Sequence, residues 1–394
     1  MRPRKVTEGV QWVGSIDWDR QLFDELIPLP DGTSYNSYLV TGSEKSALID
    51  AVDPTKTGEL AAMLDSAALS RLDYVIANHA EQDHSGSLPY VLDRYPESVL
   101  VCTPRAKGIL VDLLHIDEGR VQTVGDGETI SLGDVTLEFI HAAWVHWPET
   151  MLTYLPERKV LFPCDLFGSH LAMSELFAPV SSRLYRAAKR YYAEIMMPFH
   201  TNIEKHLDRL SAYDIEIIAP SHGPLYDEPA SIMEVYREWV SGPPANKVVI
   251  PYVSMHGSTQ LLVDRLVSGL ADLHVATVPH RLSSGDIGRL AMELVDAATV
   301  VLGSPTVLAG AHPAVVYAAF LANALRPKLQ FASVVGSYGW GGRAVEQLTG
   351  LMPNLKVELL DPVIVKGLPQ ESDLKAIDEL AGRIAEKHRE AGLV

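Results

Sequence analysis

Residues 78–86, with the sequence Asn-His-Ala-Glu-Gln-Asp-His-Ser-Gly, combine the residue types that bind metal ions. Two imidazoles and two carboxylates, from His79, Glu81, Asp83 and His84, occur within six consecutive positions directly after a short apolar run. Side chains at the end of a buried strand are held still and can converge on a pair of metal ions. In an extended backbone positions 79, 81 and 83 share one side, and His84 can reach a second ion. The cluster therefore predicts a metal centre.

Three further candidate ligands, His146, Asp165 and His222, lie at long range in the sequence. His146 stands between two tryptophans in Trp-Val-His-Trp-Pro, whose rings can keep solvent away. Asp165 and His222 each follow an apolar segment that we expect to be a strand, and a carboxylate at position 165 could bridge two ions. Together the candidates give four imidazoles and three carboxylates, enough for two metals. That mixture favours iron or manganese over zinc, because carboxylates suit harder ions.

The composition narrows the class of protein. A chain of 394 residues favours two or three domains, and its mean hydropathy of +0.07 is ordinary for a globular protein. A net charge of -17 argues against nucleic acid or an anionic membrane as partner. With only Cys102 and Cys164, a disulfide framework or a cysteine-ligated cluster is not expected. The N-terminus lacks the apolar core of a signal peptide, so we expect a soluble cytoplasmic protein.

The segment Ser241–Asn246, with the sequence Ser-Gly-Pro-Pro-Ala-Asn, is the clearest boundary, because two prolines cannot continue a helix or a central strand. It predicts domains at residues 1–244 and 245–394. The first domain reads as mixed α/β with much antiparallel character. Its predicted strands are Ser34–Val40, Ala47–Asp50, Val99–Thr103, Thr129–Ile140, Met151–Leu155 and Lys159–Pro163, and its helices include Gly58–Ala68 and Ser182–Tyr192.

The second domain alternates apolar strands with helices and ends in an amphipathic helix, Asp373–Glu390. Its predicted strands are Lys247–Ser254, Leu273–Val278, Thr299–Gly303, Leu329–Gly336 and Lys356–Val365. This alternation predicts a doubly wound parallel sheet with ligand sites beyond the carboxyl ends of its strands.

Three loops at those strand ends have the composition of a flavin mononucleotide (FMN) site. Ser254–Thr259 leads into a helix, where hydroxyl and free N–H groups suit a terminal phosphate. Ser304–Leu308 and Ser337–Gly342 could enclose a planar ring. The Lys of a phosphate-hydrolysing loop and the Gly-x-Gly-x-x-Gly of FAD and NAD sites are absent from these loops. The predicted residues are Ser254, Met255, His256, Gly257, Ser258, Thr259, Ser304, Pro305, Thr306, Val307, Leu308, Ser337, Tyr338, Gly339, Trp340 and Gly341.

On these residues the chain resembles the flavodiiron proteins, also called A-type flavoproteins, over nearly its whole length. The resemblance implies an N-terminal metallo-β-lactamase-like αββα domain with a non-haem diiron site and a C-terminal flavodoxin-like domain with FMN. By the same resemblance, one iron is held by His79, Glu81 and His146, and the other by Asp83, His84 and His222, with Asp165 as the bridge. Zinc hydrolases of this superfamily usually carry His at the position of Glu81. Tyr191 and Tyr192 match a tyrosine pair and are candidate proton donors.

The resemblance further implies reduction of dioxygen to water or of nitric oxide to nitrous oxide, with electrons relayed through FMN. It implies a head-to-tail homodimer, or a tetramer built from it, and no fused rubredoxin domain, so that a separate rubredoxin, deazaflavin or flavoprotein reductase supplies the electrons. Three features depart from the family pattern: His256 replaces a common Tyr, Val307-Leu308 replaces more polar residues, and residues 26–30 contain no His. They leave the preference between dioxygen and nitric oxide open.

Two other classes of function fit parts of the pattern. One is a dizinc hydrolase fused to a regulatory flavodoxin domain, in which zinc-bound water cleaves an ester or lactam. The other is an FMN electron carrier whose N-terminal metal is structural, although structural zinc sites usually have four ligands. Metal identity and a redox assay would separate these classes. We expect His141, His170 and His200 to lie behind the ligands or to be ordinary, and packing alone is the alternative to flavin contact for Trp340.

Overall fold

The computed structural model describes residues 2–179 and 181–394. These residues form two compact units that divide between Val240 and Ser241. The predicted boundary after residue 244 lies within the same proline-containing segment, and the functional domains drawn from it stay a prediction. Among the described residues, no helix is long and apolar enough to cross a lipid bilayer.

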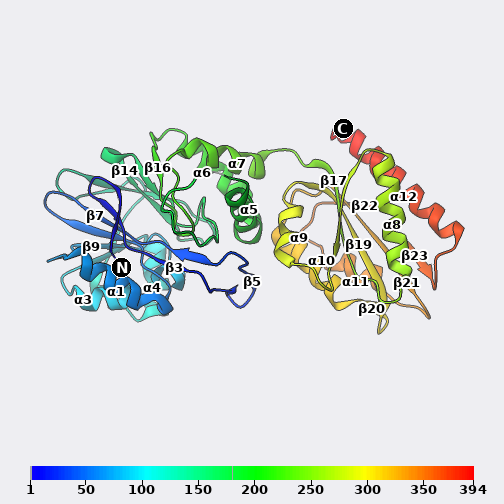
Figure 1. Cartoon of the computed structure of the whole chain (residues 1–394), viewed down its shortest axis with the longest axis horizontal. Helices are drawn as coiled ribbons and strands as arrows, with labels where there is room; N and C mark the ends of the chain where they lie inside the picture. The colour runs from blue at the N-terminus through cyan, green and yellow to red at the C-terminus, as the bar shows by residue number, and fades with distance from the viewer. Residues whose placement is uncertain (1, 180) are drawn as a thin grey trace. The chain divides into compact units, whose positions relative to one another are not determined.

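The first unit is built on two β-sheets that pack face to face (Figure 1). The first sheet has the order β1-β2-β7-β8-β9-β10-β11 and becomes parallel from β8 onward. Its strands are β1 (Arg4–Thr7), β2 (Val10–Trp12), β7 (Tyr38–Thr41), β8 (Ser46–Ile49), β9 (Tyr74–Ile76), β10 (Val99–Cys102) and β11 (Val121–Thr123). The second sheet is β12 (Thr129–Ser131), β13 (Thr136–His141), β14 (Met151–Leu155), β15 (Val160–Phe162) and β16 (Ile217–Ile218), with only β15–β16 parallel.

Helices cover the outer face of each sheet, which gives the α-β-β-α layers expected from the sequence (Figure 1). The α-helices are α1 (Thr57–Ala67), α2 (Gln82–Ser85), α3 (Leu88–Arg94), α4 (Pro104–Leu114), α5 (Ser182–Tyr191), α6 (His200–Leu210) and α7 (Pro229–Ser241). Short 3-10 turns are η1 (Pro54–Lys56), η2 (Glu118–Arg120), η3 (Pro156–Arg158) and η5 (Met197–Phe199), and η4 (Tyr192–Met196) is a π-helix. The small hairpins are β3 (Ser15–Asp17) with β6 (Thr33–Tyr35), and β4 (Leu22–Phe23) with β5 (Ile27–Pro28).

Two segments of this unit that were predicted as single strands each form two strands in the structure. The predicted strand Ser34–Val40 is β6 and β7, because Asn36 turns its amide inward to accept from Trp12 Nε1 at 2.9 Å and to donate to two carbonyl oxygens. The predicted strand Thr129–Ile140 is the hairpin of β12 and β13, which reverses around Gly133 at a φ of 110° that favours glycine. Alternating patterns cannot reveal such breaks when both arms share the same period.

The second unit is a parallel sheet in the order β18-β17-β19-β21-β22, so the predicted doubly wound topology is confirmed. The strands are β17 (Ala245–Tyr252), β18 (Ala276–Arg281), β19 (Ala297–Val307), β20 (Gly310–Ala311), β21 (Phe331–Tyr338), β22 (Glu358–Leu359) and β23 (Val363–Lys366). The order reverses between β17 and β19, and such switch points open a crevice for ligands at the carboxyl ends of the strands. The predicted strand Lys356–Val365 is wrong as one element, because it divides into β22 and β23, which both pair with β21.

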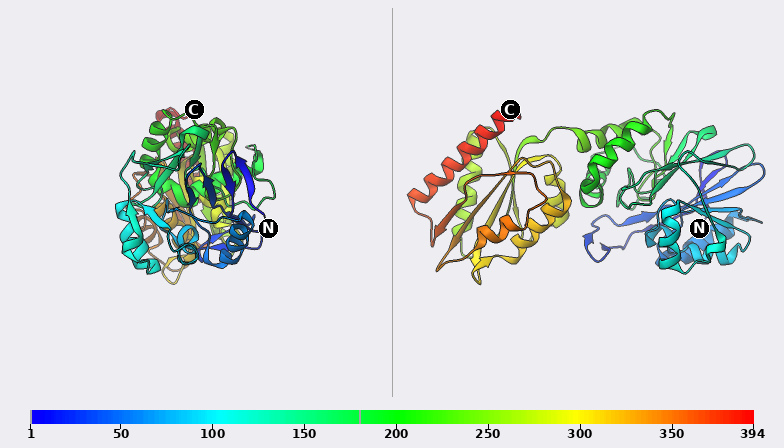
Figure 2. Two further views of the ribbon diagram at one scale, coloured as in Figure 1. Left: turned by 90° about the vertical axis from the view of Figure 1, so that its left-hand side faces the viewer. Right: turned by 180° about the vertical axis from the view of Figure 1, so that it is seen from behind.

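Each face of this sheet is covered by its own set of helices (Figures 1 and 2). On one face lie α8 (Ser258–Asp272) and α12 (Glu371–Glu390), and on the other α9 (Ile287–Leu294), α10 (Pro313–Leu325) and α11 (Ala344–Gly350). The buried strands between them are rich in Val, Ile and Leu on both faces, as parallel strands must be.

His388 fastens the last helix to the sheet. Its buried ring lies between two strands, with Nε2 at 2.7 Å from Thr299 Oγ1 and Nδ1 at 2.8 Å from Asn246 Oδ1. The ring also stacks on Phe331. Burial lowers the pKa of His388 from its ordinary 6.5.

Because the unfolded chain takes up this proton more readily, the free energy of unfolding of the second unit should fall as the pH falls below about 6.5. We expect hydrogen exchange of the β17 and β19 amides to accelerate as the pH is lowered from ~7.5 to ~5.5, after correction for intrinsic rates, because protonation of His388 in the open state favours opening. The variant His388→Gln keeps hydrogen-bonding groups but cannot titrate. Its exchange should depend less on pH, and an unchanged pH dependence would contradict this role.

Candidate metal centre and flavin site

The seven predicted metal ligands come from four places in the first unit and meet at one end of its two sheets. His79 and Glu81 lie in the loop after β9, and Asp83 and His84 lie on α2. The other three, His146, Asp165 and His222, follow β13, β15 and β16. Parallel pairing of β8 with β9 and of β15 with β16 points these strand ends in common directions, so residues far apart in sequence converge.

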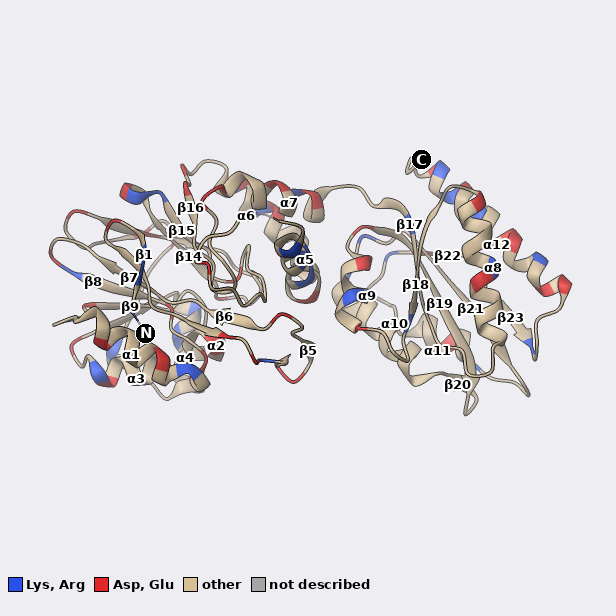
Figure 3. Cartoon of the chain, viewed as in Figure 1, with Lys and Arg blue, Asp and Glu red and all other residues tan. Residues whose placement is uncertain are grey.

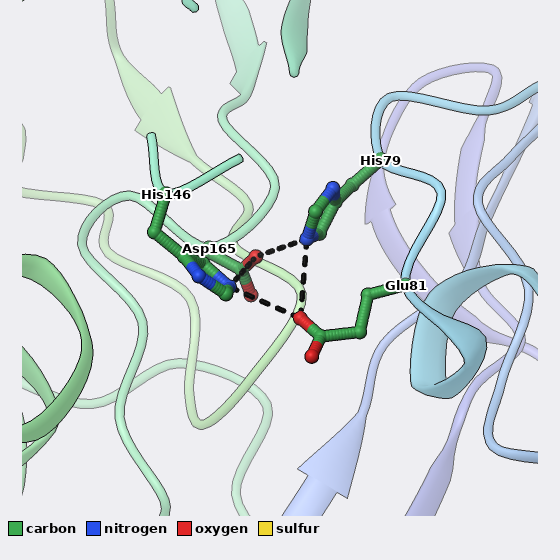
Figure 4. Close-up of side chains that lie close together, drawn as sticks. All are labelled: His79, Glu81, His146 and Asp165. Atoms are coloured by element: carbon green, nitrogen blue, oxygen red, sulfur yellow. Dashed lines mark hydrogen bonds and ion pairs between the residues drawn. The ribbon is translucent and has the colours of Figure 1, made fainter. Parts of the chain in front are cut away.

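One group of ligands surrounds a single point, as Figure 4 shows. His79 Nε2 and His146 Nε2 lie 3.2 and 3.0 Å from Glu81 Oε2. Both nitrogens lie 3.6 Å from Asp165 Oδ2. Two imidazole nitrogens and two carboxylate oxygens thus face one another at distances that would allow a single ion between them to bond to all four.

A second group lies beside the first and contains Asp83, His84 and His222. His84 Nε2 is 3.3 Å from Asp83 Oδ1 and 3.1 Å from Asp165 Oδ1. His222 Nε2 is 3.1 Å from Asp83 Oδ2 and 3.4 Å from Asp165 Oδ1. All three side chains are buried.

Asp165 joins the two groups, because its two oxygens face different ones: Oδ2 faces His79 and His146, and Oδ1 faces His84 and His222. Both oxygens of Asp83, His84 Nε2 and Asp165 Oδ2 are buried without a hydrogen-bond partner among the described residues, although ion-pair distances surround them. Ligand atoms whose lone pairs point at a common metal position are expected to lack hydrogen-bond partners in this way. The donor set therefore fits two ions, with three protein ligands each and one bridging carboxylate.

Opposite charges shift the pKa values of these groups. Burial alone would lower the pKa of His79, but its contacts with Glu149 and Glu81 raise that pKa to about 10. Burial would also lower the pKa of His222, but the contacts with Asp165 and Asp83 outweigh burial and raise that pKa to about 9. The pKa of Asp165 is held well below its usual range by His84 and His222 despite burial. Without metal, imidazolium groups stand in for the cations.

The backbone of the first cluster differs from the extended chain that the alternating spacing suggested. The chain becomes helical at Gln82, so Asp83 does not share one side with Glu81 and instead faces the second group of ligands. The loop before it is fixed by Asn78, whose N–H and Nδ2 donate to the two oxygens of buried Asp50. Asn78 Oδ1 also accepts from Thr153 on β14 at 2.7 Å, which ties the loop to the second sheet.

The turns that aim Asp165 and His222 adopt backbone conformations that L residues rarely take. Cys164 and Phe167, on either side of Asp165, have φ of 52° and 70°. Gly223, after His222, has φ of 78°, and a Cβ there would lie 2.2 Å from Ser169 Oγ. Such conformations gather where a site requires a particular side-chain direction.

A cavity of about 230 Å³ opens over both ligand groups. It is lined by Phe23, Asp24, Ile27, Glu81, Asp83, His146, Trp147, Asp165, Tyr191, Glu194, Ile195 and His222. The lining holds five carboxylates and no Lys or Arg. Three of these carboxylates, Glu81, Asp83 and Asp165, belong to the ligand groups, and Glu194 pairs with Arg190 at 3.2 Å.

The two candidate proton donors lie in different environments. Tyr191 donates from its hydroxyl to Asp165 Oδ1 at 2.7 Å and lines the cavity, and burial together with Asp165 raises its pKa well above the usual value. Tyr192 instead donates to the Trp239 carbonyl oxygen at 3.3 Å and is not among the lining residues. Proton donation thus remains a prediction for Tyr191 alone. The His170 ring lies behind the ligands, with its centre 5.1 Å from that of the His222 ring and its plane tilted by 58°.

Sequence reasoning missed Glu149. This carboxylate is 1% exposed, and its Oε1 lies 2.7 Å from His79 Nδ1 and accepts from the Ala80 N–H at 3.1 Å. Its position three residues after His146, directly before the apolar strand β14, is a signal that could have marked it, because a lone acid there requires a buried partner. Asp24 and Glu194 on the cavity wall gave no comparable signal.

In the second unit, a cavity of about 170 Å³ lies at the carboxyl ends of β17, β19 and β21. Its lining is Ser254, Met255, His256, Ser258, Thr259, Pro305, Thr306, Ser337, Tyr338, Gly339 and Gly367. The predicted Gly257, Ser304, Val307, Leu308, Trp340 and Gly341 are not among the lining residues, and Gly367 was not predicted. A Cβ at Gly257 or Gly339 would meet no atom within 4 Å, so these loops leave open space beside the N-terminus of α8.

The chain is similar to known proteins over nearly its whole length. A family model described as ODP family beta lactamase matches residues 33–223. The chain is 35% identical to the nitric oxide reductase of Moorella thermoacetica, with 98% of each covered. Its structure is similar to rubredoxin oxygen:oxidoreductase from Desulfovibrio gigas, with a TM-score of 0.93, 30% identity and 98% of each chain covered. It is also similar to the flavodiiron protein from Giardia intestinalis, with a TM-score of 0.89, 28% identity and the same coverage.

The shared carboxylate makes a prediction about metal binding. After dialysis against Fe²⁺ under anoxic conditions, the wild type should retain about two ions per chain, Asp83→Ala about one, and Asp165→Ala close to none. Elemental analysis measures these values. Asp214→Ala removes an exposed acid that pairs with Lys159 and should match the wild type. Retention of both ions by Asp165→Ala would contradict the bridging role.

Proposed function

The chain belongs to the flavodiiron protein family and is an oxidoreductase, and we propose that it reduces dioxygen to water, nitric oxide to nitrous oxide, or both. The observation that carries the proposal is the division of the Asp165 oxygens between two complete ligand groups. A shared carboxylate holds two ions close together, and a pair of redox metals is what a multi-electron reduction of a diatomic gas needs. The metallo-β-lactamase-like unit is thus proposed to carry two non-haem irons.

In this proposal, His79, Glu81 and His146 hold one iron, Asp83, His84 and His222 hold the other, and Asp165 bridges them. Bound iron would supply electrons and hold the substrate between the two ions. The protein supplies the environment. Phe23, Ile27 and Ile195 give the cavity an apolar wall that limits water.

Tyr191 is proposed to keep a proton at the cavity wall. Its raised pKa keeps the hydroxyl protonated, and the bond to Asp165 Oδ1 fixes that proton at a known atom beside the ligand groups. Reduction of either gas consumes protons, so a phenol in this position can donate one after the reaction has created a stronger base.

The second cavity is proposed to bind FMN, whose role in the family is to pass electrons to the metals. The loop before α8 has Gly257 at φ of 93° as the cap of a 15-residue helix, and the first residues of that helix, Ser258 and Thr259, line the cavity. Ser254, Ser258 and Thr259 add hydroxyl groups at the same place. This end fits a phosphate, and the wall formed by Tyr338 and Gly339 fits a flat ring.

A negative charge at the phosphate end should weaken FMN binding without affecting riboflavin, which has no phosphate. We expect Ser258→Asp to raise the Kd for FMN by at least about tenfold, or about 1.4 kcal/mol. The Kd for riboflavin should stay within about twofold of the wild type. Quenching of flavin fluorescence on titration of the flavin-free protein measures both values. Equal losses for the two flavins would contradict the placement of the phosphate.

A head-to-tail homodimer is proposed as the functional unit. Helix α10 has no charged residue, as Figure 3 shows, and its outward face carries Pro313, Tyr317, Phe320 and Ala324 at helical spacing. Tyr317 and Phe320 are 39% and 55% exposed. Contiguous exposed apolar side chains usually mark a protein contact, and a second copy is the proposed occupant. The electron donor is proposed to be a separate protein or reduced cofactor, and the cytoplasmic location stays a prediction.

The decisive experiment is to purify the protein without oxygen and measure its iron and flavin. We expect about two irons and one FMN per chain. With FMN chemically reduced, the protein should consume dioxygen or nitric oxide, and Asp165→Ala should do so at least about 100-fold more slowly. Stable zinc in place of iron after growth in iron-rich medium, with no gas consumption, would reject the reductase and favour a hydrolase.

A further inference from the structure

The outer partner of His79 differs in charge from the outer partners of His84 and His222. His79 Nδ1 lies 2.7 Å from Glu149 Oε1, and both side chains are completely buried. The Ala80 N–H also donates to Glu149 Oε1, and the Thr103 hydroxyl donates to the main-chain carbonyl of Glu149, so that one carboxylate oxygen and the backbone of this residue are both held. The bond fixes the tautomer of His79: Nδ1 carries the proton toward Glu149, and Nε2 faces the metal position.

The imidazoles of the other ligand group have neutral outer partners. His222 Nδ1 lies 2.7 Å from the Ser34 carbonyl oxygen. His84 Nδ1 faces the Cys164 thiol, with Sγ at 3.9 Å. A carbonyl or thiol acceptor orients an imidazole but does not add a negative charge behind it.

The two oxygens of Asp165 also differ in their hydrogen bonding, and the difference favours the same metal position as Glu149 does. Tyr191 donates to Oδ1, the oxygen that faces His84 and His222. Oδ2, the oxygen that faces His79 and His146, is buried without a hydrogen-bond donor among the described residues. A hydrogen bond draws electron density from a carboxylate oxygen, so Oδ1 is the weaker donor to its metal.

We propose that the two metal positions have unequal reduction potentials, and that Glu149 is the positioning residue that makes the iron beside His79 the first to be oxidised. This inference rests on the proposed function of the same site. Oxidation of the reduced pair then removes one electron from the iron held by His79, Glu81 and His146. The second electron leaves the iron held by Asp83, His84 and His222. Reduction through the flavin returns the electrons in the reverse order.

The physical reason is the stabilisation of positive charge. A buried carboxylate bonded to the Nδ1 proton makes the imidazole a stronger donor through Nε2, and this favours the metal state of higher charge. The effect is large where the dielectric constant is low. Asp50 is a second buried carboxylate near the centre. Its two oxygens accept from Asn78 rather than from an imidazole, so it lacks the direct contact with a ligand that Glu149 makes.

The test is a redox titration of the diiron protein followed by electron paramagnetic resonance of its one-electron-oxidised form. The separation between the two potentials sets how much of this form exists at the midpoint. Glu149→Gln keeps an acceptor for His79 but removes the charge. We expect the comproportionation constant to fall at least tenfold, which corresponds to about 59 mV of separation. Iron content is measured in the same samples.

Asp214→Ala is the control, because it removes an exposed acid that pairs with Lys159 and should leave the separation unchanged. Tyr191→Phe tests the same order without touching Glu149. It should narrow the separation by making Oδ1 a stronger donor. An unchanged or wider separation in Glu149→Gln with two irons bound would overturn the inference. If wild-type protein binds no iron pair, the proposed function itself fails.

Discussion

Buried charge in need of a partner is the constraint on which the first unit depends. Four imidazoles and three carboxylates converge in a region that is largely closed to water, where an unpaired ion is strongly unfavourable. Each ligand therefore needs opposite charge on its inner side and a hydrogen-bonding group behind it. The two-sheet core places four chain segments at one end of the fold, and Asn78, Glu149 and Ser34 then determine how the ligand side chains point.

The second unit solves a different problem with main-chain groups. No buried cluster of charged side chains forms its cavity; open glycines, hydroxyl groups and the N-terminus of α8 do so. Such a site suits a ligand that brings its own negative charge. The first unit thus offers charged side chains as ligands, whereas the second offers the N-terminus of a helix and hydroxyl groups, which suit an anion. Each unit is compact by itself.

The sequence predicted much of this arrangement, for identifiable reasons. The alternation of strands and helices in the second unit predicted the parallel sheet, because apolar strand segments and amphipathic helix segments follow one another regularly in that part of the sequence. The ligand types were recognisable because four of them are adjacent, and His146, Asp165 and His222 follow apolar strands. Turns inside an alternating pattern were not visible, nor was the helical turn at Gln82 that redirects Asp83. Glu149 was missed because its partner is 70 positions away and a single acid carries no spacing signal.

The short helix α2 also bears on how such a site can be inherited and altered. The loop before it directs Glu81 to one metal position, and its first turn directs Asp83 to the other. A substitution at position 81 therefore changes the ligand set of one metal position and leaves the ligands of the other in place. An insertion or deletion between these residues would rotate the turn and disturb both metals at once. Point substitution is thus the gradual route by which this framework can exchange one chemistry for another.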